Sequence, residues 1–230
     1  MLSLRGKSIK TFGINNREFE HRYRVDVTDP KDGFLPGVLQ VGIDDSSLEL
    51  QEKLDMEYER LCEDRRLSRE FIYPGRDTTT AHYLPVNLNR IVQNATQIFH
   101  IDRRKPSDLG PAYIIDQVRQ LAERLVVVRG DDPLTGEPNE NASLAFRMHL
   151  RETFAARPVL EEYHLNKEAF NRVLGEVETK FNQSMVHPGE MCGTLAAQSI
   201  GEPFHAHPQG EGGPIRDFVV SRLYSCQGCC

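Results

Sequence analysis

The residues that decide the fold run from Pro111 to Val126 and read Pro-Ala-Tyr-Ile-Ile-Asp-Gln-Val-Arg-Gln-Leu-Ala-Glu-Arg-Leu-Val. Apolar positions recur every three or four residues, with charged and amide side chains between them, which is the period of one buried helix face. That face consists of Ile114, Ile115, Val118, Leu121, Leu125 and Val126. Pro111 suits the first helical turn, where the N–H that proline lacks would have no intrahelical acceptor. The stretch therefore predicts an amphipathic helix whose apolar face needs partners elsewhere in the chain.

The same period recurs on both sides of this helix. Further helices are expected at residues 48–71, 88–99, 141–156, 167–181 and 188–200. Asn166 and Pro188 suit the starts of the last two, and residues 130–138, with their prolines and glycines, are expected to form a loop. In contrast, Tyr23-Arg24-Val25-Asp26-Val27 alternates like a half-buried strand. The predicted fold class is therefore mainly α with a small β contribution (α+β).

Composition limits the classes of function. The chain has 230 residues, a formal net charge of -6 and a mean hydropathy of -0.50. An acidic chain with only short basic clusters does not suit nucleic-acid binding through its own surface, which needs grouped Lys and Arg. No apolar run approaches the length of a membrane span. Five cysteines, three of them among the last five residues, do not form the even framework of a secreted disulfide domain. We expect a protein inside the cell, with reduced thiols and no membrane partner.

Candidate metal ligands gather only near the end of the chain. Cys226 and Cys229 have the spacing of half a zinc site, with His205 and His207 as the nearby candidates for the other half. A chance cluster in an unfolded tail is the favoured interpretation, because a bound metal would have to order the whole tail. A zinc-binding regulator is the weaker hypothesis, and metal analysis would test it. The sequence predicts no catalytic residue and no metal site in this chain.

The most specific motif lies just before that tail. Residues 186–203 read Val-His-Pro-Gly-Glu-Met-Cys-Gly-Thr-Leu-Ala-Ala-Gln-Ser-Ile-Gly-Glu-Pro. This run resembles the signature that leads into the trigger loop in the largest subunits of multisubunit RNA polymerases, and its Pro-Gly-Glu-Met form is similar to that of eukaryotic RNA polymerase II. Residues 100–109, 125–130 and 159–163 resemble the same subunit in the same order.

The resemblance implies a division of the chain and a set of site residues. It implies an unrelated stub at 1–7, a multi-helix foot-like region at 8–165, helices leading to the trigger loop at 166–203 and an aberrant, disordered tail at 204–230. In this family the trigger loop closes over the incoming nucleotide as a lid. Its base would be formed here by Pro188, Gly189, Glu190, Met191, Gly193, Ala196, Ala197, Gln198, Ser199, Gly201, Glu202 and Pro203.

The resemblance also implies an activity and its partners. It implies a fragment of a DNA-directed RNA polymerase, a nucleotidyltransferase of the nucleus that works with the other RNA polymerase II subunits. DNA template and RNA would be bound only in the full assembly, and Mg and Zn only by other parts of the full subunit. Because the family's nucleotide-sensing run is missing after Pro203, we expect the isolated chain to be inactive. The alternative is a non-catalytic helical interaction module that binds polymerase subunits or regulators.

Overall fold

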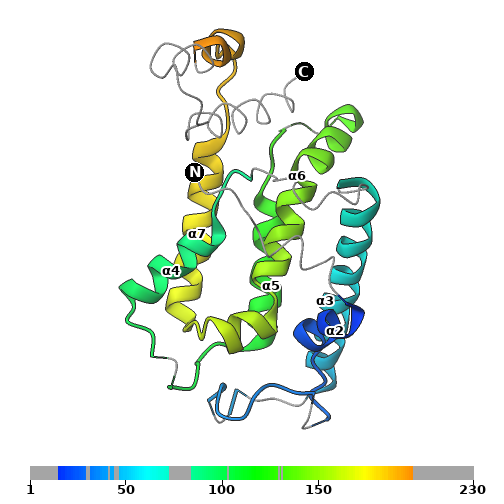
Figure 1. Ribbon diagram of the computed structural model, residues 1–230, viewed down its shortest axis with the longest axis vertical. Coiled ribbons are helices and arrows are strands. Elements are labelled where there is room, and N and C mark those ends of the chain that lie inside the picture. Colours follow the sequence, from blue (N-terminus) through cyan, green and yellow to red (C-terminus); the bar gives the residue numbers. More distant parts are fainter. Residues whose placement is uncertain are drawn as a thin grey trace, which may run out of the picture.

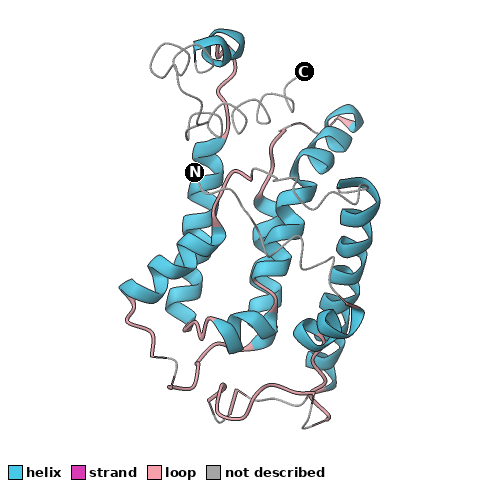
Figure 2. Ribbon diagram, viewed as in Figure 1, coloured by secondary structure: helices cyan, strands magenta, loops and turns pink. Residues whose placement is uncertain are grey.

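The computed structural model describes residues 15–29, 32–40, 42–43, 47–72, 84–102, 104–128, 130 and 132–198. The α-helices are α2 (Asn16–Tyr23), α3 (Leu48–Leu67), α4 (Leu88–Ile98), α5 (Pro111–Arg124), α6 (Pro133–Thr153) and α7 (Lys167–Ser184). Single turns of π-helix, η1 (Ser68–Ile72) and η2 (Pro158–Glu162), follow α3 and α6, and residues 192–198 are also helical. The mainly helical class is confirmed. The described residues contain no strand, only an isolated parallel bridge between Leu39 and Ser107 (Figure 2).

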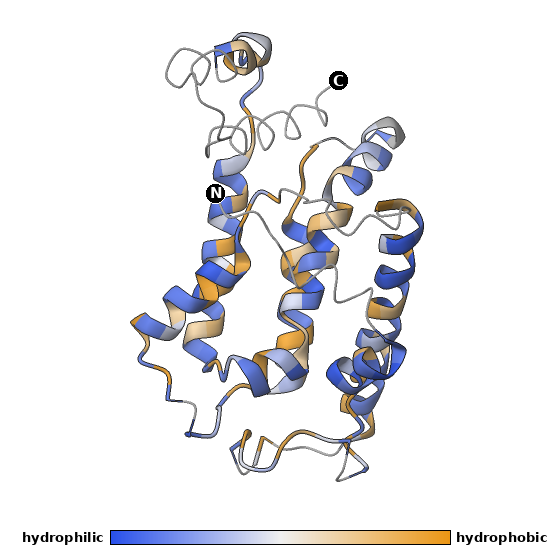
Figure 3. Cartoon of the chain, viewed as in Figure 1, coloured by the Kyte–Doolittle hydropathy of each residue, from blue (hydrophilic) through white to orange (hydrophobic). Residues whose placement is uncertain are grey.

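Helix α5 lies at the centre of the bundle. It contacts α3, α6 and α7, while α4 packs against α7 and α3 also packs against α6. In Figure 1, α5 and α6 stand between the α4–α7 pair and α3. Apolar and polar colours alternate along the helices in Figure 3, as expected for amphipathic elements that share one core. The pattern from which the fold was predicted therefore belongs to the central helix.

Aromatic side chains fill the main core. Phe154 and Phe170 are fully buried and meet edge to face, with ring centroids 6.4 Å apart, and Phe146 stacks on Phe181 at 5.3 Å. Such pairs contribute about 0.5–1.5 kcal/mol beyond the burial of their area. The predicted apolar residues of α7 are all buried, namely Phe170, Val173, Leu174, Val177 and Phe181. Of the face predicted for α5, Ile115 and Val126 are half-buried and the remainder is buried.

The predicted strand at Tyr23 to Val27 is wrong. Tyr23 is the last residue of α2, and Val25 is buried against α3 without a strand partner. Gln51 of α3 supplies the backbone partners instead. Its Nε2 donates to the Val25 carbonyl at 3.2 Å, and its Oε1 accepts from the Val27 N–H at 3.0 Å. The alternating apolar pattern of residues 23–27 reflects burial of one side of this segment. Because the segment packs on a helix and not on another strand, no β-sheet hydrogen bonds form.

Helix α6 begins at Pro133 and not, as predicted, at Asn141. The predicted loop at residues 130–138 is therefore wrong from Pro133 onward. Pro133 occupies the first helical position, whereas Pro138 lies inside the helix and removes one backbone hydrogen bond. Asn139 ties this irregular turn to the preceding loop, because its Oδ1 accepts from the backbone N–H groups of residues 127 and 128 at 2.8 and 3.3 Å.

A buried hydroxyl joins the loop before α5 to the start of α7. Ser107 Oγ donates to the Leu165 carbonyl at 2.6 Å and accepts from a backbone N–H two residues further on, at 3.1 Å. Beside it, Asp108 Oδ1 accepts from the Lys167 N–H at 2.9 Å. Asn166 occupies the predicted N-cap position, but its side chain makes no cap hydrogen bond. The first turn of α7 is therefore capped from a distant part of the chain.

The variant Ser107→Ala is expected to lower the free energy of unfolding by about 1–3 kcal/mol, because it leaves the buried Leu165 carbonyl without its donor. Urea denaturation followed by circular dichroism measures this change. The control is Thr179→Ala, an exposed hydroxyl that bonds only within its own helix, where we expect a change below about 0.5 kcal/mol. Equal losses in the two variants would contradict a role for Ser107 at the junction.

Candidate functional site

A turn and a short helix follow α7. The Glu190 N–H donates to the His187 carbonyl at 3.2 Å, which closes the turn. Gly189 has a φ of +87°, in the left-handed region where glycine is favoured because it lacks a Cβ. Residues 192–198 then form the short helix. In Figure 1 this helix, coloured orange, stands beyond the end of α7 and away from the bundle.

The structure brings together most of the residues predicted for the trigger-loop base. Pro188 and Gly189 lie in the turn, Glu190 and Met191 lie between the turn and the short helix, and Gly193, Ala196, Ala197 and Gln198 lie in the short helix. Ser199, Gly201, Glu202 and Pro203 lie outside the described residues. The predicted start of this helix at Pro188 is wrong, because the left-handed backbone of Gly189 interrupts any helix from that position.

Small residues form one uncovered face of the short helix. Gly193 and Ala197 are four positions apart, so they share a face, and both are exposed. A Cβ added at Gly193 would meet no atom of any other described segment within 4 Å. The side chain of Met191, just before this helix, is 75% exposed. The face therefore has room for the close approach of a neighbouring element.

A buried arginine connects the end of α2 to η2. Arg157 Nη1 donates to the His21 and Arg24 carbonyls at 2.7 and 2.9 Å, and Arg157 Nε donates to Glu161 Oε2 at 3.1 Å. The Arg157 side chain is only 8% exposed. Sequence reasoning missed this residue, because the two carbonyls lie 136 and 133 positions away along the chain. Charge-assisted hydrogen bonds of this kind hold a fixed geometry.

A half-buried carboxyl group lies between α3 and the residues before η2. The Ala156 N–H donates to Glu57 Oε1 and Oε2 at 3.2 and 3.4 Å. Burial raises the pKa of Glu57 to about 8, and the hydrogen bond from Ala156 opposes that shift. Desolvation penalises the charged form of an acid, so this carboxyl is mostly protonated at neutral pH. Glu57 had no place among the residues predicted from the sequence.

Charged side chains also set the position of α6 on α3. Arg151 Nε and Nη2 donate to Asp64 Oδ2 and Oδ1 at 2.6 and 2.7 Å. The Asp64 side chain is 5% exposed, against 28% for Arg151. A two-point guanidinium–carboxylate pair fixes orientation as well as distance. Two residues before Arg151, His149 is fully buried, and its Nδ1 lies 3.7 Å from Glu152 Oε2.

The described ranges contain neither a metal-binding cluster of side chains nor a helix fit to cross a membrane. In them, no three or more His, Cys, Asp and Glu side chains gather in a group that could hold a metal ion. Cys62 and Cys192 are free thiols, whereas Cys226 and Cys229 lie outside the described residues. Over the same ranges no helix combines the length and the apolar character that crossing a membrane requires.

The helical bundle matches a known protein family. The family RNA polymerase Rpb1, domain 6, matches residues 4–184. The match includes every helix from α2 to α7 and ends at the last residue of α7. It therefore contains Arg157 and Glu57, whereas the turn and the short helix follow it directly. Since the match extends over more than half of the chain, this protein belongs to the RNA polymerase Rpb1 domain 6 family, and with it to the largest-subunit family of DNA-directed RNA polymerases.

Proposed function

We propose that this chain is a fragment of the largest subunit of RNA polymerase II, in which residues 188–203 form the base of the trigger loop. One observation carries the proposal. A glycine turn and a helix with a small-residue face begin directly after the last residue of the family match. The Pro-Gly-Glu-Met form of residues 188–191 supports the RNA polymerase II assignment. The foot-like region would be residues 8–165.

In the full subunit, the role of this segment would be mechanical. A lid that closes over a nucleotide aligns the reacting groups and excludes water. Gly189 would give the turn its sharp change of direction, and the helix at 192–198 would dock through Gly193 and Ala197 on a neighbouring helix of the assembly. By the family resemblance, Mg and Zn would be held by other parts of the full subunit. The isolated chain would be inactive.

This assignment implies protein partners and a place in the cell. The partners would be the other RNA polymerase II subunits, with DNA template and RNA bound only by the complete assembly in the nucleus. A second candidate is a non-catalytic interaction module that binds polymerase subunits or regulators. It is favoured by the main core, which closes among α4, α5, α6 and α7 without help from residues 188–198. A folded bundle could bind partners even where the short helix has no role.

Affinity purification separates these candidates. The tagged full chain would be expressed in cultured eukaryotic cells, purified from nuclear extract and examined for polymerase subunits by quantitative mass spectrometry. Ala197→Leu is expected to reduce their recovery about tenfold, because overfilling a close helix contact costs about 1–3 kcal/mol. The matched control is Ala142→Leu, which adds the same bulk at an exposed position of α6, outside the short helix, and should leave recovery unchanged.

The outcomes differ between the two candidates. A selective loss with Ala197→Leu supports the trigger-loop base. Recovery that is high in the unmodified chain and equal in both variants supports the interaction module. A chain that recovers no polymerase subunit at all would contradict both proposals.

A further inference from the structure

A cleft opens between α3, α5 and α6. Its volume is about 450 Å³, within the range of pockets that hold a small molecule or a few side chains. The apolar side chains of its lining are Met56, Leu61, Ile115, Val118, Ala122 and Val126. Met56 is 49% exposed. The cleft therefore offers apolar surface that another molecule can reach, in a volume too small for a folded domain.

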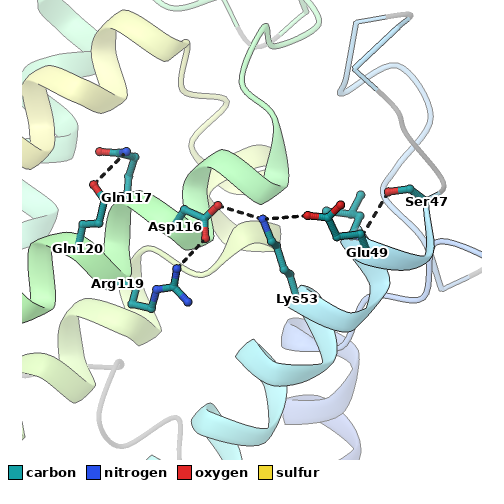
Figure 4. A network of polar contacts seen from close by, with 8 residues as sticks. Ser47, Glu49, Lys53, Asp116, Gln117, Arg119 and Gln120 are labelled. Carbon is teal, nitrogen blue, oxygen red and sulfur yellow. Dashed lines mark hydrogen bonds and ion pairs between the residues drawn. The ribbon is translucent and has the colours of Figure 1, made fainter.

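Several cations of this cleft already have acidic partners. Lys53 Nζ lies 3.1 Å from Asp116 Oδ2, and Arg119 Nη2 lies 3.2 Å from Asp116 Oδ1, as Figure 4 shows. Lys53 also lies 3.7 Å from a carboxylate oxygen of Glu49. Arg151 is paired with Asp64, as described above. These cations already have acidic partners within the chain, which compensate part of their charge.

Two other guanidinium groups line the cleft without a carboxylate partner in the described part of the chain. Arg60 is an exposed residue of α3 that has neither an ion pair nor a hydrogen bond among these residues. Arg147 of α6 donates from Nη2 to the Leu125 carbonyl at a long 3.4 Å, and its buried Nε has no partner. A buried donor without a partner is costly. An incoming acceptor would remove that cost.

The charge of Arg147 is incompletely compensated. Burial and the neighbouring Arg151 lower the pKa of Arg147, and Glu140 and Glu123 oppose this shift only in part. Glu57 also lines the cleft. Because its carboxyl is mostly protonated at neutral pH, it adds little negative charge there. The interior of the cleft therefore favours an added negative charge, although the chain as a whole is acidic.

We propose that this cleft is a docking site for a short acidic and aliphatic segment of a partner protein, with a carboxylate of that segment bound by Arg60 and Arg147. An aliphatic side chain next to the carboxylate would cover Met56 and the apolar wall. A nucleic-acid strand fits less well, since Glu123 and Glu140 in the same lining would repel a run of phosphates. The inference goes beyond the proposed function and does not depend on residues 188–203.

Fluorescence anisotropy on the full chain tests this docking site. The probe is a short fluorescein-labelled peptide with one Glu next to Leu in an otherwise Gly and Ser sequence. Arg60→Gln and Arg147→Gln are each expected to raise its Kd about tenfold, because each variant removes a charge-assisted hydrogen bond. The matched control is Arg172→Gln, an exposed arginine of α7 outside the cleft, which should leave the Kd unchanged.

Three results would overturn the proposal. The first is equal binding of a peptide in which Gln replaces every Glu. The second is an unchanged Kd in Arg60→Gln. Because Arg60 is exposed, this variant should fold, so its result decides the test if circular dichroism shows that Arg147→Gln does not fold. The third is displacement of the peptide by a single-stranded oligonucleotide at concentrations below those of unlabelled peptide, which would assign the cleft to nucleic acid.

Discussion

Replacing Arg157 by Ala is expected to lower the free energy of unfolding by about 3–5 kcal/mol, the cost of breaking a buried ion pair from one side. The variant takes the guanidinium from Glu161, which keeps the hydrogen bond from the Leu35 N–H, and takes the donor from the His21 and Arg24 carbonyls. The end of α2 would then lose its buried polar connection to η2 and keep the exposed Arg22–Glu162 pair. Urea denaturation gives the free energy, and amide hydrogen exchange shows whether protection is lost first in α2.

Arg22→Ala is the matched control for this prediction. Arg22 also links α2 to η2, through Glu162 at 3.0 Å, but its side chain is 40% exposed. An exposed pair contributes at most about 1 kcal/mol, since water and salt screen it. Similar losses of stability in the two variants would contradict the view that burial makes Arg157 the principal connection.

Glu57→Gln is expected to make the stability of this chain less dependent on pH. Below pH 4.5 the carboxyl is protonated in both the folded and the unfolded chain. Above that value the unfolded chain loses the proton, whereas the folded chain keeps it up to about pH 8. Stability contributed by the neutral carboxyl is therefore lost as pH rises through this window, by on the order of 3 kcal/mol between pH 5 and pH 8.

The measurement is the difference in unfolding free energy between the variant and the unmodified chain, taken at several pH values. The side-chain amide introduced by Glu57→Gln can still accept from the Ala156 N–H but cannot ionise, so the variant should gain relative stability as pH rises. Glu59→Gln, at an exposed position of α3, serves as the control. Parallel curves of unfolding free energy against pH for Glu57→Gln and the unmodified chain would show that the folded chain does not hold the Glu57 proton up to about pH 8.

The Arg157 and Glu57 variants test the stability of the helical bundle, which residues 188–198 follow in the chain. Arg157 and Glu57 lie within the family match, whereas Gly189 and the short helix follow it. A variant that destabilises the bundle would also weaken partner binding through the folded fraction alone. The recovery experiment therefore uses two exposed positions, Ala197 of the short helix and Ala142 of α6, where added bulk changes a surface and leaves the core intact.

Sequence patterns correctly predicted the helices that depend mainly on the spacing of neighbouring apolar residues. Apolar residues at helical spacing predicted α3, α4, α5 and α7 within a few residues. The motif at 188–203 carried the resemblance to the polymerase family, and the family match confirms that resemblance at the level of the largest subunit. Two predictions failed because the deciding contacts were distant. Gln51 completes the backbone of the predicted strand at Val25, and the first part of α6 forms despite Pro138.

The sequence by itself determined that this chain is a helical bundle of the polymerase family, because helix periodicity and a contiguous motif are written in neighbouring residues. Only the tertiary structure decided which charged side chains are buried and which are left unpaired. Glu57 meets Ala156 across 99 positions, and Arg157 meets His21 across 136. Burial of a charge depends on which distant segments exclude water around it. The spacing of neighbouring residues in the sequence does not predict those segments.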